Sequence, residues 1–326
     1  MLLYLVIALA LLIGLELSYF FIARRLGIVD RPNERSSHHR LTLRGGGIIF
    51  FLSLVVYAVF HWSSLDGEMW RLLASAMLLA VVCFADDVRG LPSWLRMLVQ
   101  IATVLISFYA FVAGVETWKI LVVVIVFVGI LNVYNFMDGL NGMLALYSIV
   151  VVGTLAAANQ FEFHFVDDAF IYTVLLGLVV FAFFNCRKRA RCFSGDVGSV
   201  VMGLIIIYLL VLYVKGQLYG GTAVSVLTFI IVFLADGLLT ITKRFLTGKN
   251  IFEPHREHLY ETIANELHVP HLRVSIFYAV LQLLINIGYF LVSDRNMYAL
   301  LCVLVLTMGY GLFFFFFNRH QEKIEG

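Results

Sequence analysis

The chain has 326 residues, of which 62% are hydrophobic and only 13% are charged, and its net charge is +2. A soluble domain of this size would have too little polar surface to cover itself. The composition therefore excludes a soluble globular protein and indicates an integral membrane protein, with no room for a separate soluble domain.

Apolar stretches of roughly 17–22 residues, each long enough to cross a bilayer as a helix, recur along the whole chain. The first has no basic residue before it and Arg24 and Arg25 after it. A cleavable signal peptide shows the reverse pattern, so we expect an uncleaved first helix. The sequence predicts a single all-α domain over residues 1–326, with spans at 1–22, 46–61, 69–85, 94–113, 118–136, 142–158, 169–185, 199–214, 222–238, 273–292 and 297–317.

Positive charges are distributed unevenly between alternate loops. Of the 23 Lys and Arg residues, only Arg71, Lys119, Lys215 and Arg295 lie on one side. By the positive-inside rule the other side is cytoplasmic, with the N-terminus outside and the C-terminus inside. The predicted cytoplasmic segments are the tail and residues 23–45, 86–93, 137–141, 186–198 and 239–272.

The unusual polar clusters all fall in or beside these cytoplasmic segments. They read "ERSSHHRLTLRGGG" (34–47), "ADDVRG" (85–90), "NVYNFMDGLNG" (132–142), "FSGDVGS" (193–199), "ADGLLTITKRF" (235–245) and "EPHREHLYE" (253–261). These clusters belong to the five predicted cytoplasmic loops, which are distant in sequence. Delivered to one membrane face, the five loops predict one shared site. In the second cluster, Asp86 and Asp87 repel each other at the end of an apolar run, where dehydration is costly.

The third cluster places Asn132, Asn135 and Asp138 at a spacing of i, i+3 and i+6. This spacing predicts one polar row along a helix, climbing towards its cytoplasmic end. Gly139 is then expected to end that helix as a C′ glycine. Hydrogen bonding between helices is the alternative interpretation of the row, but its acidic end favours a polar cleft.

The remaining clusters each allow two interpretations. Asp196 near the start of a predicted helix suits either an N-cap or a phosphate or metal site between glycines. The glycines after Arg44 suit either a phosphate contact or close helix packing. His38 and His39 also suit a solvated loop. His255 and His258 lack two further zinc ligands, so with Arg256 between them they fit phosphate contacts better.

Taken together, acids and bases share one predicted membrane face. Clustered acids are tolerated if they hold Mg²⁺, a hard cation that takes carboxylates together with substrate phosphates. Clustered bases are tolerated if they bind a polyphosphate. Both at once predict phosphoryl transfer on an anionic substrate at the membrane surface.

These motifs resemble the polyprenyl-phosphate N-acetylhexosamine-1-phosphate transferases, the superfamily of the phospho-N-acetylmuramoyl-pentapeptide translocase. The resemblance runs from residue 30 to about 262, and "DRPNERSSHHRLTLRGGG" and "PHREHLYE" are most similar to the O-antigen and capsule-initiating branch. It implies a bacterial inner-membrane enzyme that transfers the sugar-1-phosphate from a UDP-N-acetylhexosamine to polyprenyl (undecaprenyl) phosphate and releases UMP. It also implies Mg²⁺, with Mn²⁺ as an alternative, no nucleic acid, and leaves a homodimer open.

Carried onto matching positions, the resemblance assigns the residues as follows. The catalytic pair would be Asp86 and Asp87, and the Mg²⁺ ligand would be Asp196. The substrate-binding residues would be Thr42, Arg44, Asn132, Asn135, Asp138, Phe193, His255, Arg256 and His258. Leu41 and Leu43 stand where the branch usually has proline, and the uninterrupted histidine triple of the pentapeptide translocase is absent, which argues against a muramoyl substrate.

The main rival is a membrane carrier or flippase for an anionic lipid-linked substrate. Such a protein should place ionisable groups near the bilayer midplane, beside interrupted helices. Glu16 is the exception to an almost complete absence of charge there. The charge pattern therefore favours the transferase.

Overall fold

The computed structural model describes residues 1–30, 41–216, 224–251, 253 and 255–325, with side chains described as far as residue 319. Its helices begin with α1 (Leu2–Leu26), α2 (Ile48–Phe60), η1 (Trp62–Ser64), α3 (Gly67–Arg89), α4 (Ser93–Ser107), α5 (Tyr109–Val112), α6 (Thr117–Phe136) and α7 (Met143–Phe161). They continue with α8 (Asp168–Asn185), α9 (Gly195–Gly216), η2 (Ser225–Ile230), α10 (Ile231–Leu246), α11 (Leu259–Glu261), η3 (Thr262–Glu266), α12 (His271–Leu291) and α13 (Arg295–Glu325). The histidines His38 and His39 lie outside the described residues.

The prediction of an all-α polytopic membrane protein is confirmed. Within the described residues, each predicted apolar span overlaps one or two helices, and nine helical segments are long and apolar enough to cross a membrane. The two others, α2 and α4, are apolar but have only 13 and 15 residues. The count of eleven spans and the orientation in the membrane stay predictions.

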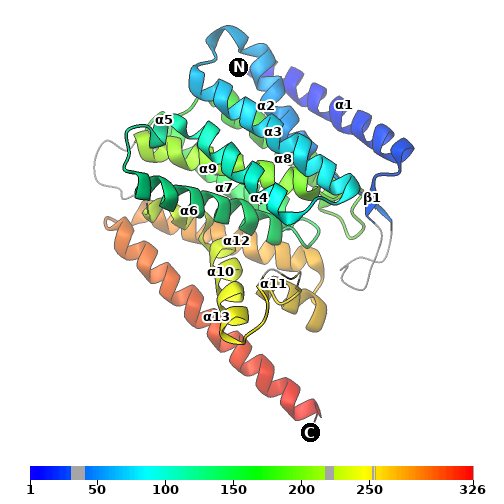
Figure 1. The fold of residues 1–326 in the computed structure, drawn as a ribbon, viewed down its shortest axis with the longest axis vertical. Coiled ribbons are helices and arrows are strands. Elements are labelled where there is room, and N and C mark those ends of the chain that lie inside the picture. Colours follow the sequence, from blue (N-terminus) through cyan, green and yellow to red (C-terminus); the bar gives the residue numbers. More distant parts are fainter. Residues whose placement is uncertain (31–40, 217–223, 252, 254, 326) are drawn as a thin grey trace.

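Helix α9 forms the centre of the bundle (Figure 1). It packs against α3, α6, α2 and α7, and nearly all of its residues from Val197 to Tyr213 are buried. A helix that is apolar on every side is buried on every side. The N-terminus of α9 is consequently fixed by its neighbours, and residue 196 with it.

A short antiparallel pairing, which the sequence did not predict, lies within the predicted loop 23–45, and this loop also bonds to the predicted loop 186–198. Strand β1 (Val29–Asp30) pairs with β2 (Thr42–Leu43), and the Phe193 N–H donates to the Leu43 carbonyl at 2.8 Å. The Gly47 N–H donates to the Ser194 carbonyl at 3.0 Å. The loop before α2 is thereby held against the loop before α9.

The ninth predicted span is a broken helix, in which the 3₁₀ turn η2 precedes α10. Backbone groups freed at such a break must be satisfied inside the protein. The Val232 N–H donates to Gln282 Oε1 at 3.0 Å, and Gln282 Nε2 donates to the Thr228 carbonyl at 2.9 Å. The Phe233 N–H donates to the Tyr147 hydroxyl at 3.2 Å. Side chains of α12 and α7 therefore satisfy the backbone at the break.

Candidate active site

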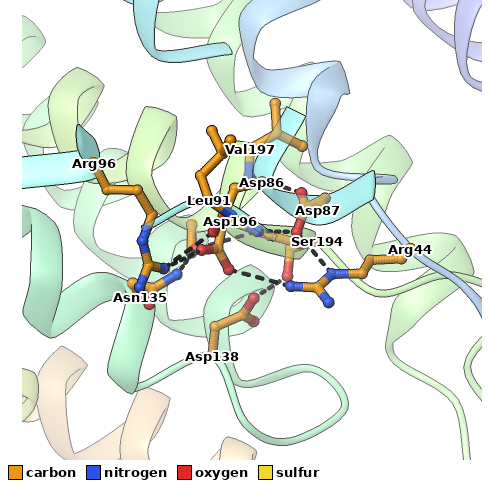
Figure 2. Close-up of polar contacts among 12 residues, drawn as sticks. Arg44, Asp86, Asp87, Leu91, Arg96, Asn135, Asp138, Ser194, Asp196 and Val197 are labelled. Atoms are coloured by element: carbon orange, nitrogen blue, oxygen red, sulfur yellow. Dashed lines mark hydrogen bonds and ion pairs between the residues drawn. The ribbon is translucent and has the colours of Figure 1, made fainter. Parts of the chain in front are cut away.

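Four aspartates from three parts of the chain gather at one end of the bundle (Figure 2). Asp86 and Asp87 lie in the last turn of α3, and Asp196 lies in the first turn of α9. Asp138 lies in the loop between α6 and α7. The structure therefore brings together carboxylates up to 110 positions apart, from three of the predicted loops.

Asp87 caps the N-terminus of α9 from a neighbouring helix. Its carboxylate accepts from the Asp196 N–H at 2.9 Å, the Val197 N–H at 3.1 Å and Arg44 Nε at 2.7 Å. Gly195 has a φ of +70°, and a Cβ there would overlap the Asp87 carboxylate, so only glycine fits this turn. The possibility that Asp196 is itself the N-cap is wrong, because Asp87 supplies the capping oxygens.

Arg96, in the first turn of α4, joins the other two carboxylates. Its Nη1 lies 3.1 Å from Asp86 Oδ2 and 3.0 Å from Asp196 Oδ2. Arg44 Nη2 approaches Asp196 from the opposite side at 3.5 Å, so the aspartates lie between two guanidinium groups (Figure 2). Arg96 is not among the site residues predicted from the sequence. Its position in the first turn of the apolar helix "SWLRMLVQIATVLIS" could have indicated a functional role, because a charged residue in such a helix is costly.

The polar row on α6 divides into two parts. Asn132 Nδ2 donates to Gln100 Oε1 of α4 at 2.8 Å, which is the interhelical hydrogen bond of the alternative interpretation. Asn135 Nδ2 donates to Ser199 Oγ at 3.0 Å, beside the aspartates (Figure 2). The predicted helix end at Gly139 is wrong, because α6 ends at Phe136. The Tyr260 ring packs against Gly139 and leaves no room for a side chain there.

Asp138 lies beside the other aspartates and accepts a short hydrogen bond from the Ser194 hydroxyl. Burial, reinforced by the nearby charges of Asp87 and Asp196, raises the pKa of Asp138 to about 8. The Ser194 hydrogen bond and the charge of Arg44 oppose this rise. At neutral pH the group is therefore mainly a neutral acid, which can donate a hydrogen bond.

The loop before α2 places Thr42 in strand β2, Arg44 against the aspartates, and three glycines in a tight turn. Gly45 has a φ of +82°. A Cβ on Gly46 would lie 2.7 Å from Cys192 Sγ, and a Cβ on Gly47 would overlap Gly198 of α9. These contacts match close helix packing, the second of the two interpretations of the glycine run; the first was a phosphate contact.

Phe193 is half-buried at the start of the turn into α9, and its carbonyl accepts from the Gly46 N–H at 2.8 Å. Glu16 of α1 is fully buried behind the same turn. Its Oε1 lies 3.9 Å from Cys192 Sγ. Both residues therefore adjoin the turn that carries Asp196.

The loop with the two histidines contacts the site through Tyr260. The Tyr260 hydroxyl donates to the Phe136 carbonyl at 2.8 Å, next to the loop that carries Asp138. His255 and Arg256 are half-buried, whereas His258 is only 3% exposed. Asp236 lies under this loop and bonds to its backbone, so it is not one of the clustered aspartates.

The donor chemistry of the four aspartates fits Mg²⁺, which prefers carboxylate oxygens. Within the described residues, no three His, Cys, Asp or Glu side chains form a ready metal-binding group. Mg²⁺ commonly binds through one or two carboxylates and completes its shell with water and substrate phosphates. Asp196, with Asp86 beside it, is the pair placed to do this, because Asp87 is occupied by the cap of α9.

Fold and site together define a polytopic membrane protein with an acidic and basic site for anionic chemistry at one end of its bundle. Residues 69–214 match the model of glycosyl transferase family 4. This match supports the family that the motifs resemble.

The curated relatives agree with this assignment. The chain is 25% identical to a probable undecaprenyl-phosphate N-acetylglucosaminyl 1-phosphate transferase of Bacillus subtilis (strain 168), covering 74% of this chain and 71% of the relative. It is 26% identical to the undecaprenyl-phosphate alpha-N-acetylglucosaminyl 1-phosphate transferase of Yersinia pestis, covering 76% and 73%. A phospho-N-acetylmuramoyl-pentapeptide-transferase of Lactobacillus helveticus (strain DPC 4571) is 30% identical, covering 48% and 57%.

Proposed function

We propose that the protein transfers an N-acetylhexosamine-1-phosphate from a UDP-sugar to undecaprenyl phosphate and releases UMP. The observation that carries this function is the group of aspartates held between Arg44 and Arg96 at the end of the bundle. The names of the relatives, which act on undecaprenyl phosphate, supply the acceptor. The product would begin a lipid-linked glycan of the O-antigen or capsule type.

In the reaction, an oxygen of the lipid phosphate attacks the β-phosphorus of the UDP-sugar. The bond from that phosphorus to the bridging oxygen breaks, and UMP leaves with the electron pair. Arg44 and Arg96 provide guanidinium groups for the phosphate oxygens, as planar donors suited to phosphate. Bound Mg²⁺, held by Asp196 and Asp86, would neutralise the diphosphate.

Asp86 would position charge more than it removes a proton. A phosphate monoester has its second pKa near about 6, so most of the lipid phosphate is already dianionic at neutral pH. Asp86 is engaged by the Leu91 N–H and by Arg96. If Asp86 were a general base, the activity loss of Asp86→Asn would shrink between about pH 6 and 8, because a base matters less as pH rises. For a residue that positions charge, we expect the loss to stay large and constant over this range.

The other assigned residues would contact substrate around this centre. Asn135 and Asp138, with Asn132 deeper in the bundle, would line the nucleotide side, and Phe193 would lie against the uracil. Thr42 and the loop with His255 and Arg256 would border the phosphates. The site would face the cytoplasm from a bacterial inner membrane. Topology reporters fused after residue 326 and within residues 159–168 test this, and we expect them to map to opposite sides of the membrane.

The decisive experiment measures UMP release by the purified protein from a panel of UDP-sugars with undecaprenyl phosphate. We expect release with a UDP-N-acetylhexosamine, its loss in EDTA, and its return with added Mg²⁺. Asp196→Asn should be inactive, whereas the matched control Asp294→Asn should be fully active. Asp294 caps the start of α13 by accepting from the Met297 N–H at 3.0 Å, a role that asparagine also fills. Full activity in EDTA would refute the role of the metal, and no release from any UDP-sugar would refute the function.

A further inference from the structure

Asp236 of α10 is a buried carboxylate that the reaction above does not use. It is 3% exposed and accepts from the Leu259 N–H at 2.9 Å and the Tyr260 N–H at 3.1 Å. The Tyr278 hydroxyl of α12 donates to it at 2.7 Å. Asp236 thus caps the first turn of α11 from a neighbouring helix, and it ties the loop that precedes α11 to α10 and α12.

His258, the last residue before α11, completes this arrangement. Its Nδ1 lies 3.5 Å from Asp236 Oδ1, and the side chain is almost fully buried. The rings of Phe136 and Tyr260 lie 6.2 and 5.7 Å away, centre to centre. A histidine enclosed in this way has little surface to offer a phosphate, so an internal ionic partner is the better account of its place.

The charged groups around His258 come from every element packed against it. Asp236 and Arg244 lie on α10, Glu261 lies on α11, and His255 lies in the same loop. Burial lowers the pKa of His258, but the carboxylate of Asp236 at 3.5 Å outweighs this and raises it above its ordinary value. Burial raises the pKa of Glu261 to about 7. The carboxylate of Asp236 thus favours the protonated form of His258.

His255 and Arg256 are more exposed than His258. Both are half-buried, and Arg256 Nη2, which is itself buried, has no hydrogen-bond partner among the described residues. The rings of His255 and His258 lie 5.0 Å apart. Burial, the charge of His258 and the charge of Arg244 lower the pKa of His255 to about 4. His255 is therefore neutral under conditions in which His258 is charged.

We propose that Asp236 and His258 form an internal ion pair that positions this loop, so that His255 and Arg256, and not His258, contact the diphosphate of the nucleotide substrate. From the sequence, His255, Arg256 and His258 are all expected to contact phosphate, whereas their burial differs in the structure. Asp236 and His258 become positioning residues. The inference rests on the proposed function for the identity of the substrate, but not for the ion pair itself.

The ion pair can be tested without any enzymatic assay. Histidine side chains of the full chain, labelled with ¹³C and placed in nanodiscs, would be titrated by NMR, with His258→Gln and His255→Gln identifying two of the nine histidine signals. In Asp236→Asn, the pKa of His258 should fall to its ordinary value of about 6.5 or below. In His258→Gln, which leaves Asp236 in place, the pKa of His255 should rise from about 4. An unchanged pKa in either variant would overturn the ion pair.

The positioning role is tested by steady-state kinetics with the UDP-sugar between about pH 6 and 8. The activity of Asp236→Asn relative to the parent should be about tenfold lower at pH 8 and should recover as pH falls, because an unpaired histidine is protonated only below about pH 6.5. His258→Gln should lose activity at every pH, and Arg256→Gln should raise KM more than it lowers kcat. The matched control Tyr278→Phe removes a neutral donor from the same carboxylate, so any loss should be independent of pH.

Three outcomes separate the possibilities. A loss in Asp236→Asn that is constant across pH would show a purely structural role and overturn the proposal. A KM effect in His258→Gln that exceeds the one in Arg256→Gln would show that His258 binds the substrate directly, which also overturns it. A parent protein that releases no UMP would refute the proposed function, while the NMR titrations would still decide on the ion pair.

Discussion

Replacement of Asp87 by alanine should destabilise the fold more than the same change at Asp86. Asp87 holds two N–H groups at the start of α9 and the guanidinium of Arg44. Loss of an N-cap costs about 1 kcal/mol. Loss of the charged hydrogen bond to Arg44 adds about 1.5 kcal/mol, the lower end of its range, because the Arg44 side chain is 34% exposed and water screens part of the interaction.

The sum of about 2.5 kcal/mol corresponds to a fall of about 5 °C in Tm, at about 2 °C per kcal/mol for a large domain. Thermal unfolding in one detergent, followed by tryptophan fluorescence, measures it. Asp86 bonds to one N–H, from Leu91, and to the half-exposed Arg96, so Asp86→Ala should cost only about 1 kcal/mol. An Asp87→Ala variant no less stable than Asp86→Ala would refute the assignment of Asp87 as the cap of α9.

Three further variants test other parts of the structure. Gly47→Ala should cost about 1–3 kcal/mol in the same unfolding assay because its Cβ would overlap Gly198, whereas Gly129→Ala, with open space around its Cβ, should be neutral or stabilising. Asp138→Asn should raise Tm at pH 8 but not near pH 4. In the parent, the raised pKa of Asp138 keeps the acid protonated in the folded state, whereas the same acid ionises in the unfolded state. The parent therefore loses stability as pH rises from about 4 to about 8, and asparagine does not. Gln282→Leu should lower Tm by an amount equivalent to about 2–3 kcal/mol, since a buried N–H of the broken helix loses its acceptor; an unchanged Tm would show that this bond is not needed.

The convergence of polar segments at one end of the bundle was predictable because a bilayer leaves few places for carboxylates. Charged groups at the bilayer centre are costly, so acids such as Asp86 and Asp196 are placed at the ends of apolar helices. The alternation of loops then indicates which ends share a side. That reasoning needs only hydropathy and charge, and it correctly brought residues of α3, α6, α9 and their loops together.

The partner of each side chain was not predictable in the same way. Hydropathy does not specify the rotation of α9 about its own axis, because this helix is apolar on all sides. The pairing of Asp87 with the N–H groups of residues 196 and 197 depends on that rotation. So does the approach of Arg96, which the sequence shows only as one basic residue at a helix start. Asp236, which lies in the predicted polar cluster 235–245, likewise faces the backbone of α11 and not the other acids.

The arrangement of charge explains why adjacent aspartates can remain at the end of an apolar helix. Asp87 is stabilised by the N-terminus of α9 and by Arg44, and Asp86 is stabilised by Arg96. Asp196 lies between both arginines, whose side chains are about one third exposed. A diphosphate that recruits Arg44 and Arg96 would take positive charge away from Asp196 and Asp86. Asp196 and Asp86 would then carry negative charge without a positive partner. A divalent cation would neutralise that charge. On this account, nucleotide and metal would bind cooperatively, each restoring the charge balance that the other disturbs.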